Sequence, residues 1–212
     1  MYMPRHFTED STDAAVAMAR SVGFGHLVVV GPDGPTSTPV PFLISDDGTR
    51  VRAHLARPNA IWKLAPCDAL LVVPISDAYI SPGWYPSKAE HGKVVPTWNY
   101  EVVHMHGRLV AHDDADWTAT MVGDLTDLNE AGLPEPWTLH DAPADFIGQL
   151  MRGIVGVELE VVRIDAKRKL SQNKSEADLA GATSGLAGCP LPRSEAVRRA
   201  MDERKGAWDL NG

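Results

Sequence analysis

The chain has 212 residues, 44% of them hydrophobic, and a formal net charge of −8 at pH 7. This size and composition provide for a full hydrophobic core and exclude a disordered chain. No apolar run reaches the roughly 20 residues that cross a bilayer, and the first residues lack the apolar stretch of a signal peptide, so we expect a cytoplasmic protein without membrane contact. Residues 1–162 carry ten basic against twenty-one acidic side chains, which disfavours direct binding to nucleic acid.

A helix followed by antiparallel strands is predicted for the first third of the chain. Residues Thr8 to Val22 begin with capping side chains and repeat apolar residues at helical spacing as far as Gly23. Short β-branched or alternating runs, separated by turns rich in Gly, Pro and Asp, then predict strands over His26–Val30, Pro39–Ser45, Thr49–Leu55 and Ala69–Ile75. This punctuation is typical of an antiparallel sheet.

The strand over Thr49–Leu55 leads into a candidate anion-binding turn. Its alternation separates an apolar face from a second face that carries Arg50, Arg52 and His54. Arg57 follows, and residues 58–64 predict a short helix whose first turn presents backbone N–H groups beside it. Two interpretations stay open: an arginine at a strand end is ordinarily just solvated, but here it could also hold an anionic group.

The segment from Tyr79 to Tyr100 contains five of the chain's fourteen aromatic residues and three prolines. A core strand would be richer in Val, Ile and Leu, whereas turns fixed by proline and carrying Trp and Tyr supply flat apolar walls with polar tips. The segment is therefore either a packed aromatic turn or one wall of a site for a planar ligand.

The second half of the chain predicts further strands and helices. His104 and His106 share one face of a strand over Glu101–Ala111; such a pair can ligate a metal, but no third ligand is close in sequence. Helical spacing predicts helices near residues 117–128, 144–151 and 194–205, and alternation predicts a long strand over Ile154–Ile164. The predicted fold is mainly β with peripheral helices, an α+β chain built on a closed or partly split barrel.

Domain organisation and cysteine usage are simple. We expect residues 1–173 to form one cofactor-binding domain and residues 174–212 a tail with a short peripheral helix. Cys67 and Cys189 lie outside any zinc or redox spacing, so we expect two free thiols.

Several blocks, in order, resemble the PaiB-like family, whose members are described as FMN-binding proteins or negative transcriptional regulators. The blocks are residues 1–7, 54–57, 78–82, 84–92, 94–100, 153–156 and 169–173. The resemblance implies an FMN-binding-like split β-barrel that forms a homodimer, with two equivalent cofactor clefts between the subunits.

The same resemblance implies the residues of the cofactor cleft. His54, Ala56, Arg57 and Asn59 align with positions that hold the FMN phosphate and ribityl chain, with Arg57 as the charged fork. Aromatic and polar side chains complete the expected set of cofactor-binding residues: Trp84, Trp98, Asn99, Ser171 and Gln172.

The sequence departs from the usual family pattern at Pro39 and Ala60, and these departures favour haem as a second candidate cofactor. One PaiB-like branch, the piperazate synthases, is understood to use haem to cyclise an N-hydroxylated ornithine by forming a nitrogen–nitrogen bond. We therefore predict a haem b enzyme of this type acting on a small-molecule substrate, with His54 as the axial metal ligand and His104 and His106 in reserve. Four side chains are candidate catalytic residues: Tyr79, Ser81, Tyr85 and Lys88. The alternative is an FMN-binding regulator or a small flavin oxidoreductase.

Overall fold

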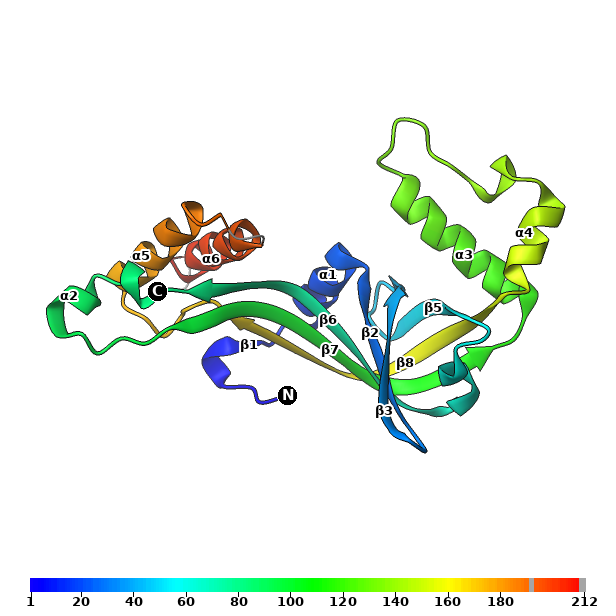
Figure 1. Cartoon of the computed structure of the whole chain (residues 1–212), viewed down its shortest axis with the longest axis horizontal. Helices are drawn as coiled ribbons and strands as arrows, with labels where there is room; N and C mark the ends of the chain where they lie inside the picture. Colours follow the sequence, from blue (N-terminus) through cyan, green and yellow to red (C-terminus); the bar gives the residue numbers. More distant parts are fainter. Residues whose placement is uncertain (191–192, 210–212) are drawn as a thin grey trace. The chain divides into compact units, whose positions relative to one another are not determined.

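A computed structural model describes residues 1–190 and 193–209 (Figure 1). The chain forms two compact units. Unit 1 consists of Met1–Asp10, Pro74–Val103 and Asp165–Gly212, and unit 2 consists of Ser11–Val73 and His104–Ile164. Three long strands, β6, β7 and β8, each contribute residues to both units.

Within the described residues, eight strands form one sheet in which neighbours follow the order β3-β2-β6-β7-β8-β5-β4, and β1 pairs with β8. The strands are β1 (Thr8–Glu9), β2 (Phe24–Gly31), β3 (Gly34–Pro41), β4 (Leu43–Ile44), β5 (Arg50–Ala56), β6 (Cys67–Ile80), β7 (Thr97–His112) and β8 (Ile154–Lys169). The pairs β1·β8, β2·β3, β2·β6, β4·β5 and β5·β8 are antiparallel, as the turn-rich sequence predicts.

The helices cover the sheet and connect its strands. The α-helices are α1 (Thr12–Val22), α2 (Ser87–His91), α3 (Ala115–Glu130), α4 (Ala144–Met151), α5 (Glu176–Ala187) and α6 (Ser194–Asp209). Short 3-10 helices are η1 (Arg5–Phe7), η2 (Ala60–Leu64), η3 (Pro82–Trp84) and η4 (Leu139–Asp141). None of the helices in the described part of the chain is long and apolar enough to cross a membrane.

The start of the first helix differs from the prediction for a local reason. The first helix begins at Thr12 rather than Thr8, because Ser11 caps it by accepting a hydrogen bond from the Ala14 N–H at 3.2 Å. Thr8 and Glu9 instead pair with β8. The helix ends at Gly23, whose φ of 62° is the left-handed conformation that favours glycine.

The strands around the aromatic segment are longer than predicted. β6 continues to Ile80, β7 begins at Thr97, and β8 continues to Lys169. Alternation accounts for the extension of β6, since Ala78 and Ile80 are buried while Tyr79 is exposed. The proline-rich connection is thereby reduced to residues 81–96.

The carboxyl-terminal part of the chain was expected to carry one short peripheral helix, and this is wrong in detail. It contains two helices, α5 and α6, whose buried faces belong to the core of unit 1, and Figure 1 shows both on one side of β6. Their buried residues Ala182, Leu186, Val197, Ala200 and Met201 pack with Ala78, Ile80, Tyr85 and Leu170. The predicted domain boundary at residue 173 stays a prediction.

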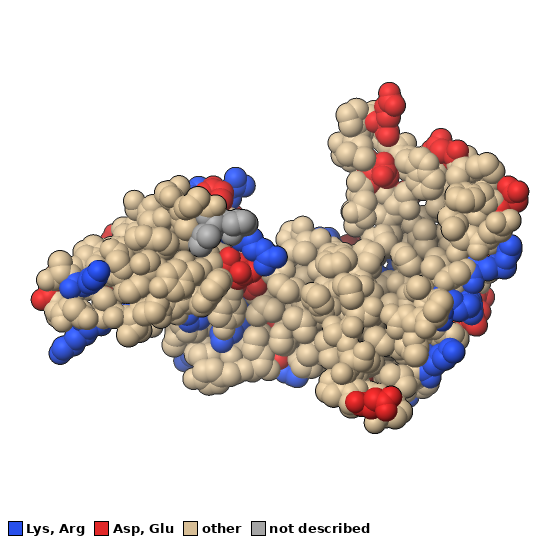
Figure 2. Space-filling view, in the orientation of Figure 1, with Lys and Arg blue, Asp and Glu red and all other residues tan. Residues whose placement is uncertain are grey.

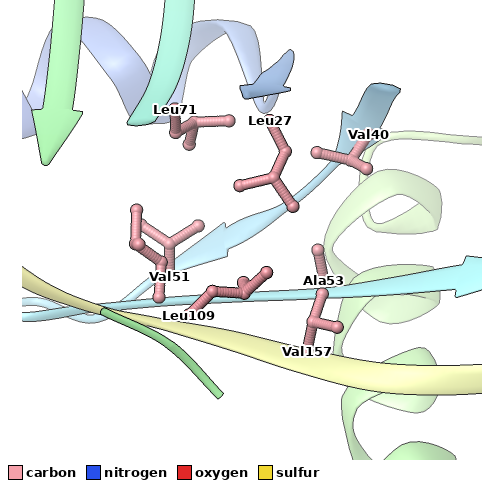
Figure 3. A pocket seen from close by; sticks show the side chains of 8 residues that line it. Leu27, Val40, Val51, Ala53, Leu71, Leu109 and Val157 are labelled. Atoms are coloured by element: carbon pink, nitrogen blue, oxygen red, sulfur yellow. The ribbon is translucent and has the colours of Figure 1, made fainter. Parts of the chain in front are cut away.

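The core of unit 2 is closely packed. Figure 3 shows apolar side chains of β2, β3, β5, β6, β7 and β8 pointing into one interior, whose free volume is about 10 Å³. A space of this size holds one water molecule at most. A cofactor therefore has to bind outside this interior.

Candidate functional site

The structure divides the predicted site residues into two sets. His54, Ala56, Arg57 and Asn59 belong to unit 2, and the remainder belong to unit 1. The unit 1 set contains Tyr79, Ser81, Trp84, Tyr85, Lys88, Trp98, Asn99, Ser171 and Gln172.

Arg57 is already engaged within the chain. Its Nη2 and Nη1 donate to Asp113 Oδ1 at 2.7 Å and Asp113 Oδ2 at 3.2 Å. Its Nε donates to the Arg152 carbonyl at 2.9 Å, and Nη2 also donates to the Ile154 carbonyl at 3.2 Å. The hydrogen bond with Asp113 raises the pKa of Arg57 and lowers that of Asp113. The charge predicted to hold a phosphate is thus offset by a carboxylate, and that role stays a prediction.

Asn59 serves as the cap of η2. Its Oδ1 accepts a hydrogen bond from the Ile61 N–H at 3.1 Å, and its Nδ2 donates to Thr38 Oγ1 at 3.1 Å. Ala56 is the exposed last residue of β5, and its carbonyl accepts from the Asn59 N–H at 2.8 Å. These contacts shape the turn after β5 and engage both the oxygen and the nitrogen of the Asn59 amide.

His54 lies on β5 opposite Gly156 of β8. Its Nδ1 is buried and has no hydrogen-bond partner, and burial lowers the pKa of the imidazole. An unpaired buried nitrogen is unusual and marks a position that could accept a ligand contact. Among the described residues, however, no group of three His, Cys, Asp or Glu side chains could hold a metal ion. The His104 and His106 rings lie 6.2 Å apart in unit 2, on one face of β7 as predicted.

Asn99, Ser171 and Gln172 are buried in unit 1 and satisfy one another or the backbone. Asn99 is 0% exposed, and its amide hydrogen-bonds to the Ser171 hydroxyl and to Met201 Sδ. Gln172 Oε1 accepts from the Leu170 N–H at 2.7 Å, and its amide donates to the Arg168 carbonyl. These side chains fasten α6 and the end of β8, so their predicted contact with a cofactor stays untested.

Trp84 and Tyr85 also pack inside unit 1. A side chain added at Gly185 would overlap the Trp84 indole, and one added at Gly181 would overlap the Trp84 main-chain carbonyl, so these glycines let Trp84 lie against the α5 backbone. Tyr85 is 2% exposed, and its hydroxyl makes no hydrogen bond of good geometry. Burial raises the pKa of Tyr85, and the nearby Ser171 hydroxyl lowers it by less. Lys174 Nζ lies 4.8 Å from the centre of the Tyr85 ring.

The opposite face of the unit 1 strands combines aromatic rings with lysine side chains. We call it the aromatic–lysine face; it consists of Tyr79 on β6, Trp98 and Tyr100 on β7, and Lys167 and Lys169 on β8. Trp98 is 54% exposed, and its ring meets that of Tyr79 edge to face at 6.1 Å. This is the exposed part of the predicted aromatic wall.

The two lysines of this face lie over aromatic rings. Lys167 Nζ is 5.3 Å from the Tyr100 ring centre and 5.6 Å from that of Tyr2, and it donates to the Tyr2 carbonyl at 3.1 Å. Lys169 Nζ lies 6.0 Å from the Tyr100 ring centre and donates to Thr97 Oγ1 and to the Trp98 carbonyl. Burial lowers the pKa of Lys169, and the neighbouring charges of Lys167 and Lys174 lower it further.

The remaining two candidate catalytic residues have ordinary positions. Ser81 caps η3 by accepting a hydrogen bond from the Gly83 N–H at 3.1 Å. Lys88 is exposed on α2. Neither the capping bond of Ser81 nor the exposed position of Lys88 distinguishes a catalytic group from a structural one, so both catalytic roles stay predictions.

The sequence analysis missed a buried ionic cluster in unit 1. Glu101 is 5% exposed; its carboxylate accepts hydrogen bonds from Arg168 Nε at 2.7 Å and from Ser76 Oγ at 2.9 Å. Arg168 also lies 3.8 Å from Glu9. The alternation of β7 could have placed Glu101 on the buried face with Asn99 and Val103, which is a signal for a paired charge.

Two surface pockets of unit 2 lie beside the predicted phosphate residues. One, of about 390 Å³, lies between the turn joining β2 and β3 and η2, and its one charged lining residue is Asp33. The other, of about 460 Å³, lies between α3 and α4 and is lined by Arg57 and Arg152 but also by Asp113, Asp114 and Asp116. Neither lining has the excess of positive charge that a phosphate dianion favours.

The chain is similar to proteins of known sequence over most of its length. The family model described as "Putative FMN-binding domain" matches residues 1–163. The Bacillus subtilis (strain 168) protein named Protease synthase and sporulation protein PAI 2 is 27% identical over 208 residues, which cover 96% of this chain and 98% of that protein.

Solved structures share the fold. The flavocytochrome Anf3 from Azotobacter vinelandii superimposes with a TM-score of 0.62 at 18% identity, over 84% of this chain and 78% of its own. The FAD and heme binding protein from Mycobacterium smegmatis gives a TM-score of 0.55 at 13% identity, over 82% and 78%. The predicted mainly antiparallel split-barrel fold with outer helices is confirmed. The homodimer predicted with it is not tested.

Proposed function

The chain belongs to the PaiB-like family of FMN-binding domains, and on that premise we propose that it is a flavin-binding protein whose cofactor is FMN. The observation that carries the proposal is the match of an FMN-binding domain to residues 1–163, more than three quarters of the chain. A bound flavin supplies hydride and single-electron transfer.

The aromatic–lysine face fits a flavin by its chemistry. A flavin has a wide planar ring system and an anionic tail. Tyr79 and Trp98 offer exposed ring surface, and Lys167 and Lys169 bring positive charge to the same face. The interior of unit 2, at about 10 Å³, has no room for such a group. This chain's residues would bind and orient the flavin on an open face, where a second surface is needed to exclude water.

A second copy of the chain is the proposed source of that surface. Tyr2 and Trp98, which belong to unit 1, are 83% and 54% exposed. Large exposed aromatic side chains of this kind are enriched at interfaces between proteins. We expect light scattering after size exclusion to give twice the mass of one chain. A monomer that retains FMN would contradict this part of the proposal.

The proposed activity is that of a small flavin oxidoreductase acting on a small molecule. From the sequence we predicted a haem-dependent piperazate synthase, with a flavin protein as the alternative. The family match favours the flavin alternative. The two solved structures whose names include haem or cytochrome are 18% and 13% identical to this chain, so they support the fold and not the cofactor. The unpaired Nδ1 of His54 is the feature on which a haem reading would depend.

A regulatory role is the second candidate, favoured by the full-length similarity to the protease synthase and sporulation protein PAI 2. Figure 2 shows basic and acidic side chains interspersed on the face drawn, without a continuous basic stripe. A role through ligand sensing therefore fits better than direct DNA contact. A salt-sensitive gel shift with DNA from the chain's own promoter would establish the direct version.

Absorption spectroscopy of the purified protein tests the main proposal. We expect the two absorption bands of a flavin, and fluorescent FMN in the supernatant after denaturation. Protein that is colourless as purified should acquire these bands when FMN is added. A Soret band after haem addition, with no uptake of FMN, would reject the proposal and restore the haem reading.

A further inference from the structure

We infer that helix α4 of one copy of the chain docks on the aromatic–lysine face of a second copy. The contact joins Phe146 and Leu150 of α4 to Trp98 of the face, with acidic side chains around the first surface and lysines around the second. This inference rests on the dimer in the proposed function, since it names the part of the second copy that covers the face. A dimer with twofold symmetry contains the contact twice.

α4 has an apolar side that the single chain leaves uncovered. Four of its eight residues are large and apolar, and none of the eight is buried: Phe146, Ile147, Leu150 and Met151 are the four. Phe146 and Leu150 lie one turn apart and are 52% and 54% exposed; we call this pair the α4 ridge. Figure 1 shows α4 beside α3, and the pocket of about 460 Å³ lies between the two helices, so α3 covers α4 incompletely. Large apolar side chains that adjoin on a surface mark a site of protein contact.

The surroundings of the α4 ridge are acidic. Residues 113–151, which contain α3, α4 and their connection, hold nine of the chain's 28 acidic residues and none of its 20 lysines and arginines. We call this segment the acidic arm. Asp113 and Asp124 form ion pairs with arginines of unit 2. Four exposed acids of the arm have carboxylates with no hydrogen bond or ion pair among the described residues: Asp116, Asp127, Glu135 and Asp145. The arm therefore favours a partner that carries positive charge.

The aromatic–lysine face has the complementary properties. Trp98 is 54% exposed and Tyr79 is 37% exposed. Lys169 is only partly buried, and its hydrogen-bond acceptors are a hydroxyl and a main-chain carbonyl, neither of them charged. Lys167 and Lys174 add two further positive charges close to it. The face thus offers apolar ring surface beside positive charge.

The carboxylates of the same face are matched by other cations. Asp77 precedes Tyr79 by two positions on β6 and forms an ion pair with Arg193. Asp165 precedes Lys167 by two positions on β8 and lies 3.7 Å from the amino terminus. Because both acids have cations of their own, the face keeps the positive charge of its lysines.

Charge favours the aromatic–lysine face over a contact between two acidic arms. Two arms placed against each other would bring carboxylates of like charge together, and such a juxtaposition is costly. An arm placed on the face of the second copy instead brings carboxylates to lysines and the α4 ridge to Trp98. Aromatic side chains are enriched in the cores of protein interfaces, where a few residues supply most of the binding energy. The α4 ridge and Trp98 are therefore the expected centre of the contact.

A mixture of two charge-reversed variants provides the decisive experiment. Asp145→Lys alters the arm beside the α4 ridge and Lys169→Glu alters the face, so each variant alone meets like charge and should raise the dimer Kd about tenfold. In an equimolar mixture, both contacts of the heterodimer regain opposite charges, and the wild-type dimer Kd should return. Sedimentation equilibrium at several protein concentrations measures each Kd. Asp13→Lys, at an exposed aspartate in the first turn of α1, is the matched control for Asp145 in the first turn of α4.

Serine substitutions test the apolar part of the contact. Phe146→Ser and Leu150→Ser should each raise the dimer Kd about tenfold, because they remove side chains from the centre of the interface. Phe24→Ser, at a phenylalanine of β2 that is 48% exposed, should leave the Kd unchanged. Thermal unfolding verifies that each variant is folded. Flavin absorbance of the same preparations measures FMN content separately from mass.

Three outcomes would overturn the inference. In the first, folded Phe146→Ser and Leu150→Ser proteins dimerise as tightly as wild type, which leaves the α4 ridge to a different partner. In the second, the charge-reversed variants dimerise like wild type, or their mixture associates no better than either variant alone. In the third, the wild-type chain is a monomer at every concentration; a flavin spectrum then rejects the dimer but keeps the proposed cofactor. A dimer that passes both tests without taking up FMN supports the inference and rejects the cofactor. If Lys169→Glu fails to fold, the two serine variants decide alone.

Discussion

The side chains of Arg57 and Asp113 form a two-point ion pair, with Nη2 to Oδ1 at 2.7 Å and Nη1 to Oδ2 at 3.2 Å. The pair joins the turn after β5 to the residue that follows β7. An arginine that sequence comparison alone would give to a ligand is thereby part of the framework of unit 2. Replacing Asp113 therefore tests separately whether Arg57 stabilises the fold and whether it binds a ligand.

Asp113→Asn should release the Arg57 guanidinium without tightening FMN binding. Because Arg57 stays tied to the Arg152 and Ile154 carbonyls, we expect the FMN Kd to change less than twofold. The urea midpoint should fall slightly, since an exposed ion pair contributes little. Titration of FMN and urea denaturation of the same preparation measure both effects. Markedly tighter FMN binding would show that Asp113 competes with the phosphate for Arg57.

Trp98 and Asn99 are neighbours on β7 with opposite surroundings, and they should respond differently to substitution. Asn99→Ala should destabilise the protein by about 1–3 kcal/mol, because it leaves the buried Ser171 hydroxyl without its partner. Trp98→Leu should leave stability nearly unchanged but weaken FMN about tenfold through loss of ring contact. Trp137→Leu, at an exposed tryptophan of unit 2, should change neither quantity. Equal losses of FMN affinity in the Trp98 and Trp137 variants would argue against the aromatic–lysine face.

Gly185→Ala should destabilise unit 1. The added methyl group would overlap the Trp84 indole, and overpacking of this kind typically costs about 1–3 kcal/mol. Gly148→Ala, in α4, meets no atom within 4 Å and should be neutral or stabilising by up to about 1 kcal/mol. Urea denaturation of both variants tests the contrast. A neutral Gly185→Ala would mean that Trp84 is loosely held.

Asp47 should titrate well below an ordinary aspartate. Its carboxylate accepts hydrogen bonds from the Ser45 hydroxyl and from the Thr49 N–H and hydroxyl, which lower its pKa from 3.8 to about 2. Because the folded pKa is depressed, the stabilisation is complete above pH 3.8 and is lost as the pH falls through about 2. Carbon-detected NMR of the Asp47 carboxyl group measures the midpoint. Ser45→Ala should move the midpoint upward, and an unshifted wild-type midpoint near 3.8 would contradict the hydrogen-bond pattern.

Patterns that depend on neighbours in sequence predicted much of the fold. Alternation located the strands, and Gly23 marked the end of the first helix. The predicted strands corresponding to β6 and β8 are too short, because residue type does not match burial near their ends: the aromatic Tyr79 is exposed, whereas the charged Lys167 is buried. Local sequence patterns predict that a lysine faces solvent. The burial of Lys167 depends instead on Tyr2 and Tyr100, which are distant from it in sequence.

The candidate site was predicted less well, for a related reason. Residue type identified Tyr79 and Trp98 correctly as exposed ring surface. Residue type did not reveal that Asp113 is paired with Arg57, or that Asn99 points into the core beside Ser171. Such pairings join positions dozens of residues apart, and nothing in either local sequence specifies them.

Burial alternates along β7 in a single register that continues from unit 1 into unit 2. Its odd-numbered residues are buried without interruption from Asn99 in unit 1 to Leu109 in unit 2, while Trp98 and Tyr100 occupy the even positions. Inserting or deleting one residue anywhere between Tyr100 and Leu109 would reverse one end of the strand relative to the other. Either the aromatic rings would turn into the core of unit 1, or Leu109 would leave the interior of unit 2. Changes in chain length should therefore be tolerated in the exposed connection over residues 88–93 and should prevent folding when they fall within this strand.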